Sequence, residues 1–387
     1  MNSILRYTLF LAMTVVIWGG LSSCQEDDMS GGEPMVSFIR ITAPESADSL
    51  VVSAGQGQMI SIMGENLQNV KQLYFNDRPA TLNPSFITSS SVIVTVPSKI
   101  PSEINNLMTM VFSNGDSLKV PFEVRISAPS VDRFLSEYVN EGDVAVVYGN
   151  YFYEPLSVTF SGDVAGEILE VEDDQILVRV PAGAEVGPIS VTSKFGTSKS
   201  KVYFRDDRNI IADFDGSLAN WVWQGSSWVV DSDPEISNIN DKFIRVNRGA
   251  QPAGPYIEFY GGSKEEGSDI AAVTKNIPED AFVNPGNYSL KFELNTLESL
   301  VGAVMWIYLG DANNGDLGSA RGTNYEWKSN EDTGGEWATI SIPWNEVYEA
   351  NQRFAYDPTG YAMFLIFNGP SAATYNIGMD NFRVVPN

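Results

Sequence analysis

The sequence predicts an all-β protein with two small tandem β-sandwiches followed by a larger one. Short runs rich in Val, Ile, Thr, Phe and Tyr alternate with clusters of Gly, Pro, Asn and Asp, a pattern typical of strands and turns. No stretch of the mature chain has a sustained helical period. A pattern of strands in the first two hundred residues also recurs about 85 residues later. The chain of 387 residues is long enough for several domains.

The first residues predict an export signal that ends at a lipidation site. Arg6 precedes an apolar run over residues 9–18, which is too short to span a membrane but suits the hydrophobic region of a signal peptide. Residues 21–24 read Leu-Ser-Ser-Cys, which resembles the lipobox of bacterial lipoproteins, and Cys24 is the only cysteine. We therefore expect a signal peptide over residues 1–23 and acylation of Cys24. The alternative is an ordinary signal peptide with an incidental cysteine.

The residues that follow predict where the lipoprotein is sent. Residues 25–28 read Gln-Glu-Asp-Asp, which resembles the acidic signal that directs some Gram-negative lipoproteins to the outer face of the outer membrane. Residues 24–37 are otherwise poor in apolar side chains, so they predict a flexible tether. We expect a lipid-anchored protein of the cell outer membrane that faces the outside.

The composition excludes several classes of function. Lys and Arg number 24 against 49 Asp and Glu, which gives a formal net charge of −25 and repels nucleic-acid backbones. With no histidine and one cysteine, the chain cannot form Ser-His-Asp or Cys-His catalytic systems, metal sites that depend on His or several Cys, or an intramolecular disulfide. We therefore expect no nucleic-acid partner, and we assign no metal and no cofactor. A structural calcium held by Asp213, Asp215 and Asp380, of the kind that jelly-roll modules often bind, stays an open alternative.

The internal repeat predicts two copies of one domain. A strand that ends near Gly64 has its counterpart near Gly149, and a later strand that ends at Pro97 has its counterpart at Pro181. Glycine suits a sharp turn of a strand, and proline ends strand pairing. These motifs resemble the IPT/TIG immunoglobulin-like (Ig-like) fold, whose members bind DNA or space other domains; the acidic charge favours a stalk here. The two copies span residues 38–126 and 127–205.

The last domain, residues 206–387, is distinguished by its aromatic residues. Seven of the eight tryptophans lie in it. Apolar and polar residues alternate over 288–294, which predicts a strand with one face in a core and one in water, and a similar alternation over 337–343 assigns Trp337 to packing. These strands predict a jelly-roll-like β-sandwich.

Exposed aromatic rings predict a carbohydrate-binding surface in this domain. The C–H face of a pyranose is apolar, so a flat ring removes it from water while neighbouring polar side chains bind its hydroxyls. Strand parity assigns Ile257 and Phe259 to the core, which turns Tyr256, Glu258 and Tyr260 to the other face.

Further tryptophans are expected on the surface for different reasons. In the apolar run 301–309, alternate residues suit the core, which leaves Trp306 on the opposite face. Trp327 lies in a polar segment between Gly322 and Gly334, which predicts an exposed loop. Any single one of these rings could instead be a core residue. The candidate glycan-binding residues are Trp223, Tyr256, Trp327, Trp306, Tyr260 and Trp221.

The order of the motifs resembles a known family. A lipobox, an acidic signal, tandem IPT/TIG repeats and a Trp-rich β domain with motifs at 213–216, 335–343 and 379–384 are similar to the cell-surface glycan-binding proteins of gut polysaccharide-utilisation systems, in particular the B-type with a xyloglucan-binding C-terminal domain. The resemblance implies a non-catalytic domain that holds a β-glucan or xyloglucan-like glycan on aromatic side chains, with Trp223 and Tyr256 at the expected positions. It also implies two partners, a surface endo-hydrolase and an outer-membrane glycan transporter.

Two alternatives remain open on the sequence alone. A lipid-anchored glycoside hydrolase would need two carboxyl groups about 5 to 10 Å apart across the sugar. The acids that it could use are Glu258, Glu293, Glu326, Glu336 and Glu346. An adhesin or stalk without a sugar site would place every tryptophan in a core.

Overall fold

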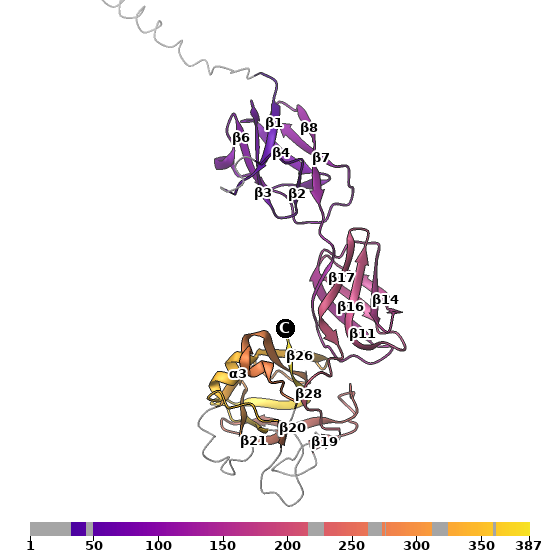
Figure 1. Cartoon of the computed structure of the whole chain (residues 1–387), viewed down its shortest axis with the longest axis vertical. Helices are drawn as coiled ribbons and strands as arrows, with labels where there is room; N and C mark the ends of the chain where they lie inside the picture. Colours follow the sequence, from indigo (N-terminus) through magenta and orange to yellow (C-terminus); the bar gives the residue numbers. More distant parts are fainter. Residues whose placement is uncertain are drawn as a thin grey trace, which may run out of the picture. The chain divides into compact units, whose positions relative to one another are not determined.

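The computed structural model describes residues 32–43, 49–215, 228–261, 273–274, 276–311, 324–358 and 361–387. Within these residues the protein is all-β, as predicted, with a few short helical turns (Figure 1). The chain divides into two compact units, Met1–Ile126 and Ser127–Asn387. The described helices are all too short or too polar to cross a membrane.

The first unit contains a β-sandwich whose core lies between two antiparallel sheets. Its elements are β1 (Met35–Ile41), β2 (Ser53–Gly55), β3 (Met59–Glu65), β4 (Val70–Phe75), β5 (Arg78–Pro79), η2 (Pro84–Phe86), β6 (Ser91–Thr95), β7 (Leu107–Phe112), β8 (Ser117–Pro121) and β9 (Glu123–Arg125). One sheet has the order β1-β3-β6 and the other β5-β4-β7-β8, while β2 pairs in parallel with β9. Ile60, Leu73 and Met110 are fully buried between the sheets.

The second Ig-like domain repeats this arrangement at the start of the second unit. Its strands are β10 (Ser130–Phe134), β11 (Val144–Asn150), β12 (Leu156–Ser161), β13 (Val164–Ala165), β14 (Glu167–Val171), β15 (Gln175–Arg179), β16 (Glu185–Ser193) and β17 (Gly196–Phe204). The sheets have the orders β10-β11-β15-β14 and β13-β12-β16-β17. Val147, Val178 and Val191 are fully buried between them. The strands β3, β4, β6 and β7 thus have counterparts in β11, β12, β15 and β16, as the sequence repeat requires.

The repeated glycines are explained by the close approach of a neighbouring strand. A Cβ added to Gly64 would lie 1.9 Å from the carbonyl oxygen of Met35, and one added to Gly149 would lie 1.8 Å from that of Ser130. Neither glycine has the left-handed backbone that marks a sharp turn. The requirement is therefore space for the first strand of each domain, and not the change of strand direction that the sequence suggested.

The C-terminal domain is a sandwich of two sheets. Its strands are β18 (Ile210–Ala212), β19 (Val229–Val230), β20 (Phe243–Gln251), β21 (Ile257–Gly261), β22 (Val273–Thr274), β23 (Tyr288–Thr296), β24 (Val304–Asp311), β25 (Tyr325–Lys328), β26 (Trp337–Pro343), β27 (Tyr361–Phe367) and β28 (Ala373–Pro386). The six-stranded sheet has the order β19-β20-β28-β23-β26, with β18 paired to β28, and the five-stranded sheet has the order β21-β27-β24-β25, with β22 paired to β27. The short helices are α2 (Asp280–Val283), η4 (Pro285–Asn287) and α3 (Trp344–Ala350).

Strand parity predicted the core of this sandwich correctly. Leu290, Phe292 and Leu294 of β23 are fully buried between the sheets, and so are Ile257 and Phe259 of β21. The same core contains Met305, Ile307, Leu309, Ile340 and Ile342. Period-two alternation therefore identified the inward residues of four strands.

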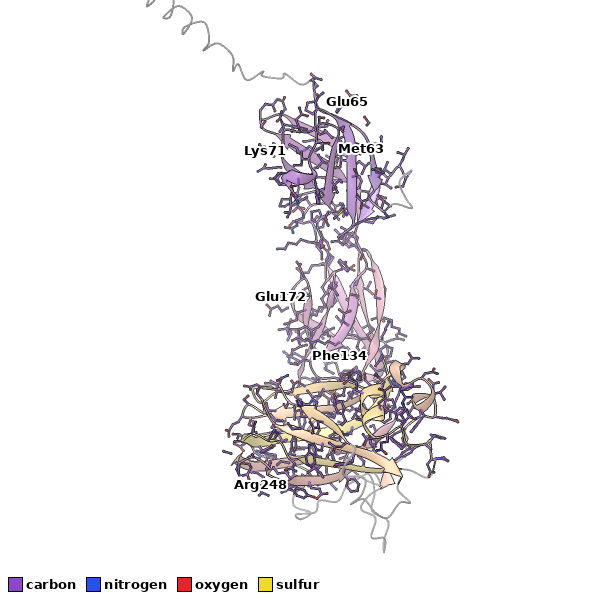
Figure 2. The ribbon with its side chains drawn as sticks, turned by 90° about the vertical axis from the view of Figure 1, so that its left-hand side faces the viewer. Met63, Glu65, Lys71, Phe134, Glu172 and Arg248 are labelled. Carbon is purple, nitrogen blue, oxygen red and sulfur yellow. The ribbon has the colours of Figure 1, made fainter. Side chains whose placement is uncertain are left out.

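The polar face of β23 does not lie in water, contrary to the expectation. Lys291 is 7% exposed and Glu293 is 0% exposed. Residues 135–139, which follow β10 in the second Ig-like domain, cover this face of the six-stranded sheet, and Ser136 Oγ donates to Glu293 Oε2 at 2.9 Å. Figure 2 shows Phe134, the last residue of β10, beside the C-terminal sandwich. A polar strand face is thus buried by another domain.

Four charged side chains form an ion-pair network across this contact. Glu137 accepts a hydrogen bond from Lys291 Nζ at 2.5 Å and another from Arg383 Nη2 at 2.6 Å. Arg383 Nη2 also donates to Glu293 Oε1 at 2.8 Å. The exposed fraction of each of these residues is 7% or less. Burial alone would lower the pKa of Arg383, but the carboxylates of Glu137 and Glu293 raise it above its ordinary value, whereas burial raises the pKa of Glu293.

An apolar cluster lies beside the network. It contains Tyr138, Ile236, Ile239, Phe243 and Trp337. Trp337 packs edge-on against Phe243, with ring centroids 5.6 Å apart, and its indole N–H donates to the carbonyl of Ser237 at 2.7 Å. Trp337 is therefore a packing residue, as predicted.

Candidate functional site

The outer face of the five-stranded sheet lies on the opposite side of the sandwich from residues 135–139. Cross-strand register places Glu258, Ile366, Trp306 and Glu326 in one row across β21, β27, β24 and β25. Because successive residues of a strand alternate between faces and the neighbours of these residues face the core, the row lies on the outer face. This face is where the structure brings predicted site residues together.

A cleft of about 530 Å³ opens beside the indole of Trp306. Its lining includes Gly254, Val304, Trp306, Glu326, Lys328 and Gly369. Asn368 N donates to Val304 O at 3.1 Å, and Gly254 N donates to Gly369 O at 2.9 Å, which joins two loops at this end of the sheet. A Cβ on Gly369 would lie 3.1 Å from Val304 N, so glycine allows the loop after β27 to close against β24.

The cleft combines an aromatic ring with charged hydrogen-bonding groups. Trp306 is half-buried, whereas Glu326 and Lys328 on the adjacent strand are exposed. Register pairs Trp306 with Glu326 and Val304 with Lys328. A half-exposed indole can cover the apolar face of a sugar, while a carboxylate accepts and an ammonium donates hydrogen bonds at its edge. Sequence reasoning missed Lys328, although reading 325–328 as a strand would have placed it beside this ring.

Tyr256 precedes β21 and lies near the cleft, whereas Tyr260 lies further along β21. Tyr256 is 36% exposed, and it follows Gly254 by two residues, next to the cleft wall. Its φ of 51° is a left-handed value, which turns the chain sharply before β21. The backbone of Tyr260 pairs with Phe364. Trp221 and Trp223 lie outside the described residues.

The prediction that Trp327 is exposed is wrong. Trp327 is 7% exposed and packs edge-on against Phe292, with ring centroids 5.4 Å apart. It lies opposite the core residue Met305 in the pairing of β24 with β25, so alternation directs it inward. Its polar neighbours Glu326 and Lys328 occupy the wet face of an edge strand and do not mark a loop.

Glu258 is also buried, at 1% exposure, although it lies on the outer face as parity predicted. Glu258 and Glu326 are three strand spacings apart in their row, which is about 14 Å at about 4.8 Å per spacing. Glycoside hydrolysis needs two carboxyl groups about 5 to 10 Å apart. The backbone spacing of these two acids is wider than that range.

Two other acids named for a hydrolase have structural contacts elsewhere. Glu293 belongs to the buried ion-pair network on the other sheet. Glu346 accepts a hydrogen bond from Tyr325 Oη at 3.1 Å, and burial together with this bond raises the pKa of Tyr325 to about 12. Tyr325 and Glu326 are neighbours on a strand, so Glu346 lies on the other side of β25 from Glu326.

Comparison with known protein families identifies the family of the C-terminal domain. The model described as the surface glycan-binding protein B xyloglucan binding domain matches residues 204–386. The C-terminal domain belongs to this family. The IPT/TIG domain model matches residues 48–124 in the first unit. The resemblance to surface glycan-binding proteins of the B type that the motifs indicated is thereby confirmed.

Two known proteins illustrate the relationship. An IPT/TIG domain-containing protein of Bacteroides ovatus is 32% identical over 171 residues, which cover 42% of this chain and 35% of that protein. The chain thus spans about a third of the length of this curated relative. The crystal structure of the surface glycan-binding protein PbSGBP-B from Prevotella bryantii matches with a TM-score of 0.65 at 24% identity, over 92% of this chain and 99% of that one. This likeness shows a shared fold.

Proposed function

We propose that the protein is a non-catalytic, lipid-anchored glycan-binding protein of the outer cell surface. It holds a β-glucan or xyloglucan-like polysaccharide on aromatic side chains of its C-terminal domain and presents it to a surface endo-hydrolase and an outer-membrane transporter. The cleft beside Trp306, in a domain of the surface glycan-binding protein B family, carries the proposal. Tyr256, Tyr260, Trp221 and Trp223 are proposed as further contributors to the same surface.

The chemistry of the cleft supports binding of a neutral glycan. Trp306 offers an aromatic face, and Glu326 and Lys328 offer an acceptor and a donor beside it. The formal net charge of −25 disfavours polyanions as ligands. The wide spacing of Glu258 and Glu326 supports retention of the bound chain over cleavage. A site with few stacked rings should bind with a Kd of about μM to mM.

Trp306→Ala should weaken binding of xyloglucan by about tenfold or more, because it removes the aromatic platform of the cleft. The measurement is affinity gel electrophoresis and calorimetry with xyloglucan, on protein that starts at Gly32 and so retains the whole described structure. Phe86→Ala, which removes a 45% exposed ring from the first unit, is the matched control and should bind like the wild type. Unchanged binding by a folded Trp306→Ala variant, or release of reducing ends by the wild type, would contradict the proposal.

Cys24→Ser should release the protein from the membrane fraction, because the acyl chains on this residue are proposed to be the anchor. The measurement is fractionation of cells that express either form, combined with the mass of the purified protein. Ser23→Ala leaves the acylated atom in place and should remain in the membrane fraction. A Cys24→Ser protein that still fractionates with the membrane would refute the lipid anchor without affecting the glycan site.

A further inference from the structure

A second cleft lies at the other end of the five-stranded sheet. The cleft has a volume of about 490 Å³, and its lining includes Asn209, Asn276, Tyr356, Asp357 and Tyr361. It is built where β27 begins, whereas the Trp306 cleft is built where β27 ends. The seven residues of β27 separate the two clefts by about 23 Å, at about 3.3 Å per residue.

The ring of Tyr356 is exposed but firmly supported from below. Tyr356 is 40% exposed, and its ring centroid lies 5.6 Å from that of Phe282. Phe282 in turn stacks on the buried Tyr361, also at 5.6 Å, and contacts Phe354 at 5.4 Å. These aromatic contacts hold the exposed ring of Tyr356 in place. The ring therefore loses less conformational entropy when a ligand stacks against it.

Two oriented amides line the same cleft as this ring. Asn209 Nδ2 donates to the carbonyl of Val384 at 2.9 Å, and Asn276 Nδ2 donates to the carbonyl of Ile210 at 2.9 Å. An amide has two N–H donors and a carbonyl acceptor, so one such bond fixes its orientation and leaves capacity for a ligand. The backbone N–H of Asp357 donates to Tyr361 Oη at 2.6 Å, which fixes the loop that carries Tyr356.

We propose that the Tyr356 cleft is a second subsite for the polysaccharide that occupies the Trp306 cleft. A supported aromatic face flanked by amides is the chemistry that recognises a neutral sugar. The described lining contains a carboxylate and no Lys or Arg side chain, which disfavours an anionic ligand. The inference rests on the proposed function and adds a second point of attachment to it.

Two subsites about 23 Å apart favour long chains over short ones. A polysaccharide that is bound at one cleft reaches the other at a high effective concentration, or a second stretch of the same chain does so. A short oligosaccharide occupies one cleft at a time and gains nothing from the other. The Tyr356 cleft therefore contributes selectively to the retention of polymer.

The experiment compares xyloglucan polymer with a xyloglucan oligosaccharide of one repeat, on protein that starts at Gly32. Tyr356→Ala should weaken binding of the polymer about tenfold and leave oligosaccharide binding at the Trp306 cleft within about twofold. Tyr356→Phe keeps the ring and should bind like the wild type. Val283→Ala, at the end of α2, removes a 70% exposed apolar side chain close to Phe282 and is the matched control. Thermal melts verify that all variants fold.

The outcomes separate the two proposals. Polymer binding by Tyr356→Ala that equals that of Val283→Ala overturns the second subsite and leaves the proposed function intact. Equal loss of polymer and oligosaccharide binding in Tyr356→Ala also overturns it, because the two clefts would then not act independently. A wild-type protein that retains neither ligand overturns the proposed function itself. Selective loss of polymer binding supports the second subsite.

Discussion

Glu137→Ala should destabilise the C-terminal domain by about 3 to 5 kcal/mol, although Glu137 belongs to the second Ig-like domain. The substitution removes one of two anions from a network in which Lys291 and Arg383 are almost completely buried. Glu293 would remain as the single carboxylate for two cations. A buried charge without a partner costs several kcal/mol, and neither cation can turn to water without opening the contact between the domains.

Tryptophan fluorescence reads this effect in the domain that was not mutated. In protein that starts at Gly32 every tryptophan lies after residue 206, so the fluorescence reports on the C-terminal domain and, through Trp337, on its contact with Tyr138. The expected result is a large shift of the denaturant midpoint to lower concentration. Glu141→Ala removes the same charge from an exposed position a few residues later and should shift the midpoint by no more than about 0.5 kcal/mol. Equal midpoints for the two variants would show that the network does not couple the domains.

Trp344→Ala should lower the free energy of unfolding by about 3 to 5 kcal/mol, because it removes the largest fully buried side chain of the C-terminal domain. The Trp344 indole stacks on Tyr348 with ring centroids 6.2 Å apart, and its N–H donates to the carbonyl of Ala281 at 3.0 Å. The substitution thus leaves a cavity and deprives a buried carbonyl of its donor.

Denaturation followed by far-ultraviolet circular dichroism measures the loss, since the substitution removes a fluorophore. Trp344→Phe keeps most of the packing and loses the N–H, so it should cost clearly less than Trp344→Ala. Trp344 also contacts Phe282, which supports the ring of Tyr356. A cost below about 1 kcal/mol for Trp344→Ala would mean that the aromatic cluster closes over the cavity.

The strands and their core-facing residues were predictable because alternation is a local property of the chain. Leu290, Phe292 and Leu294 needed nothing beyond the sequence of β23. The opposite face of the same strand could not be predicted, because its environment comes from residues about 150 positions earlier. A hint was present: Lys291 and Arg383 are basic side chains in the middle of strands of a strongly acidic chain, and such residues need a partner when they are buried.

The candidate site was predicted in part. Parity placed Trp306 on the outer face, and the structure gives it a cleft. The polar neighbours of Trp327 suggested a loop, so the prediction that its side chain is exposed was wrong. Alternation along β25 would have directed it into the core. The clefts at both ends of β27 are formed by loops that are distant in sequence. Asn276 and Tyr356, for example, line the same cleft, and no local sequence pattern predicts that they meet.

The buried ion pairs determine where this protein can be cut. A protein engineer who wanted a transferable affinity tag for plant polysaccharides would look to the 204–386 match and clone from Asp206. That fragment would carry Lys291 and Arg383 without Glu137, and the face of the six-stranded sheet that residues 135–139 normally cover would be exposed with unpaired charges. A usable tag begins instead at Ser127, where the compact unit begins. The second Ig-like domain is then included and keeps this face of the glycan-binding domain covered.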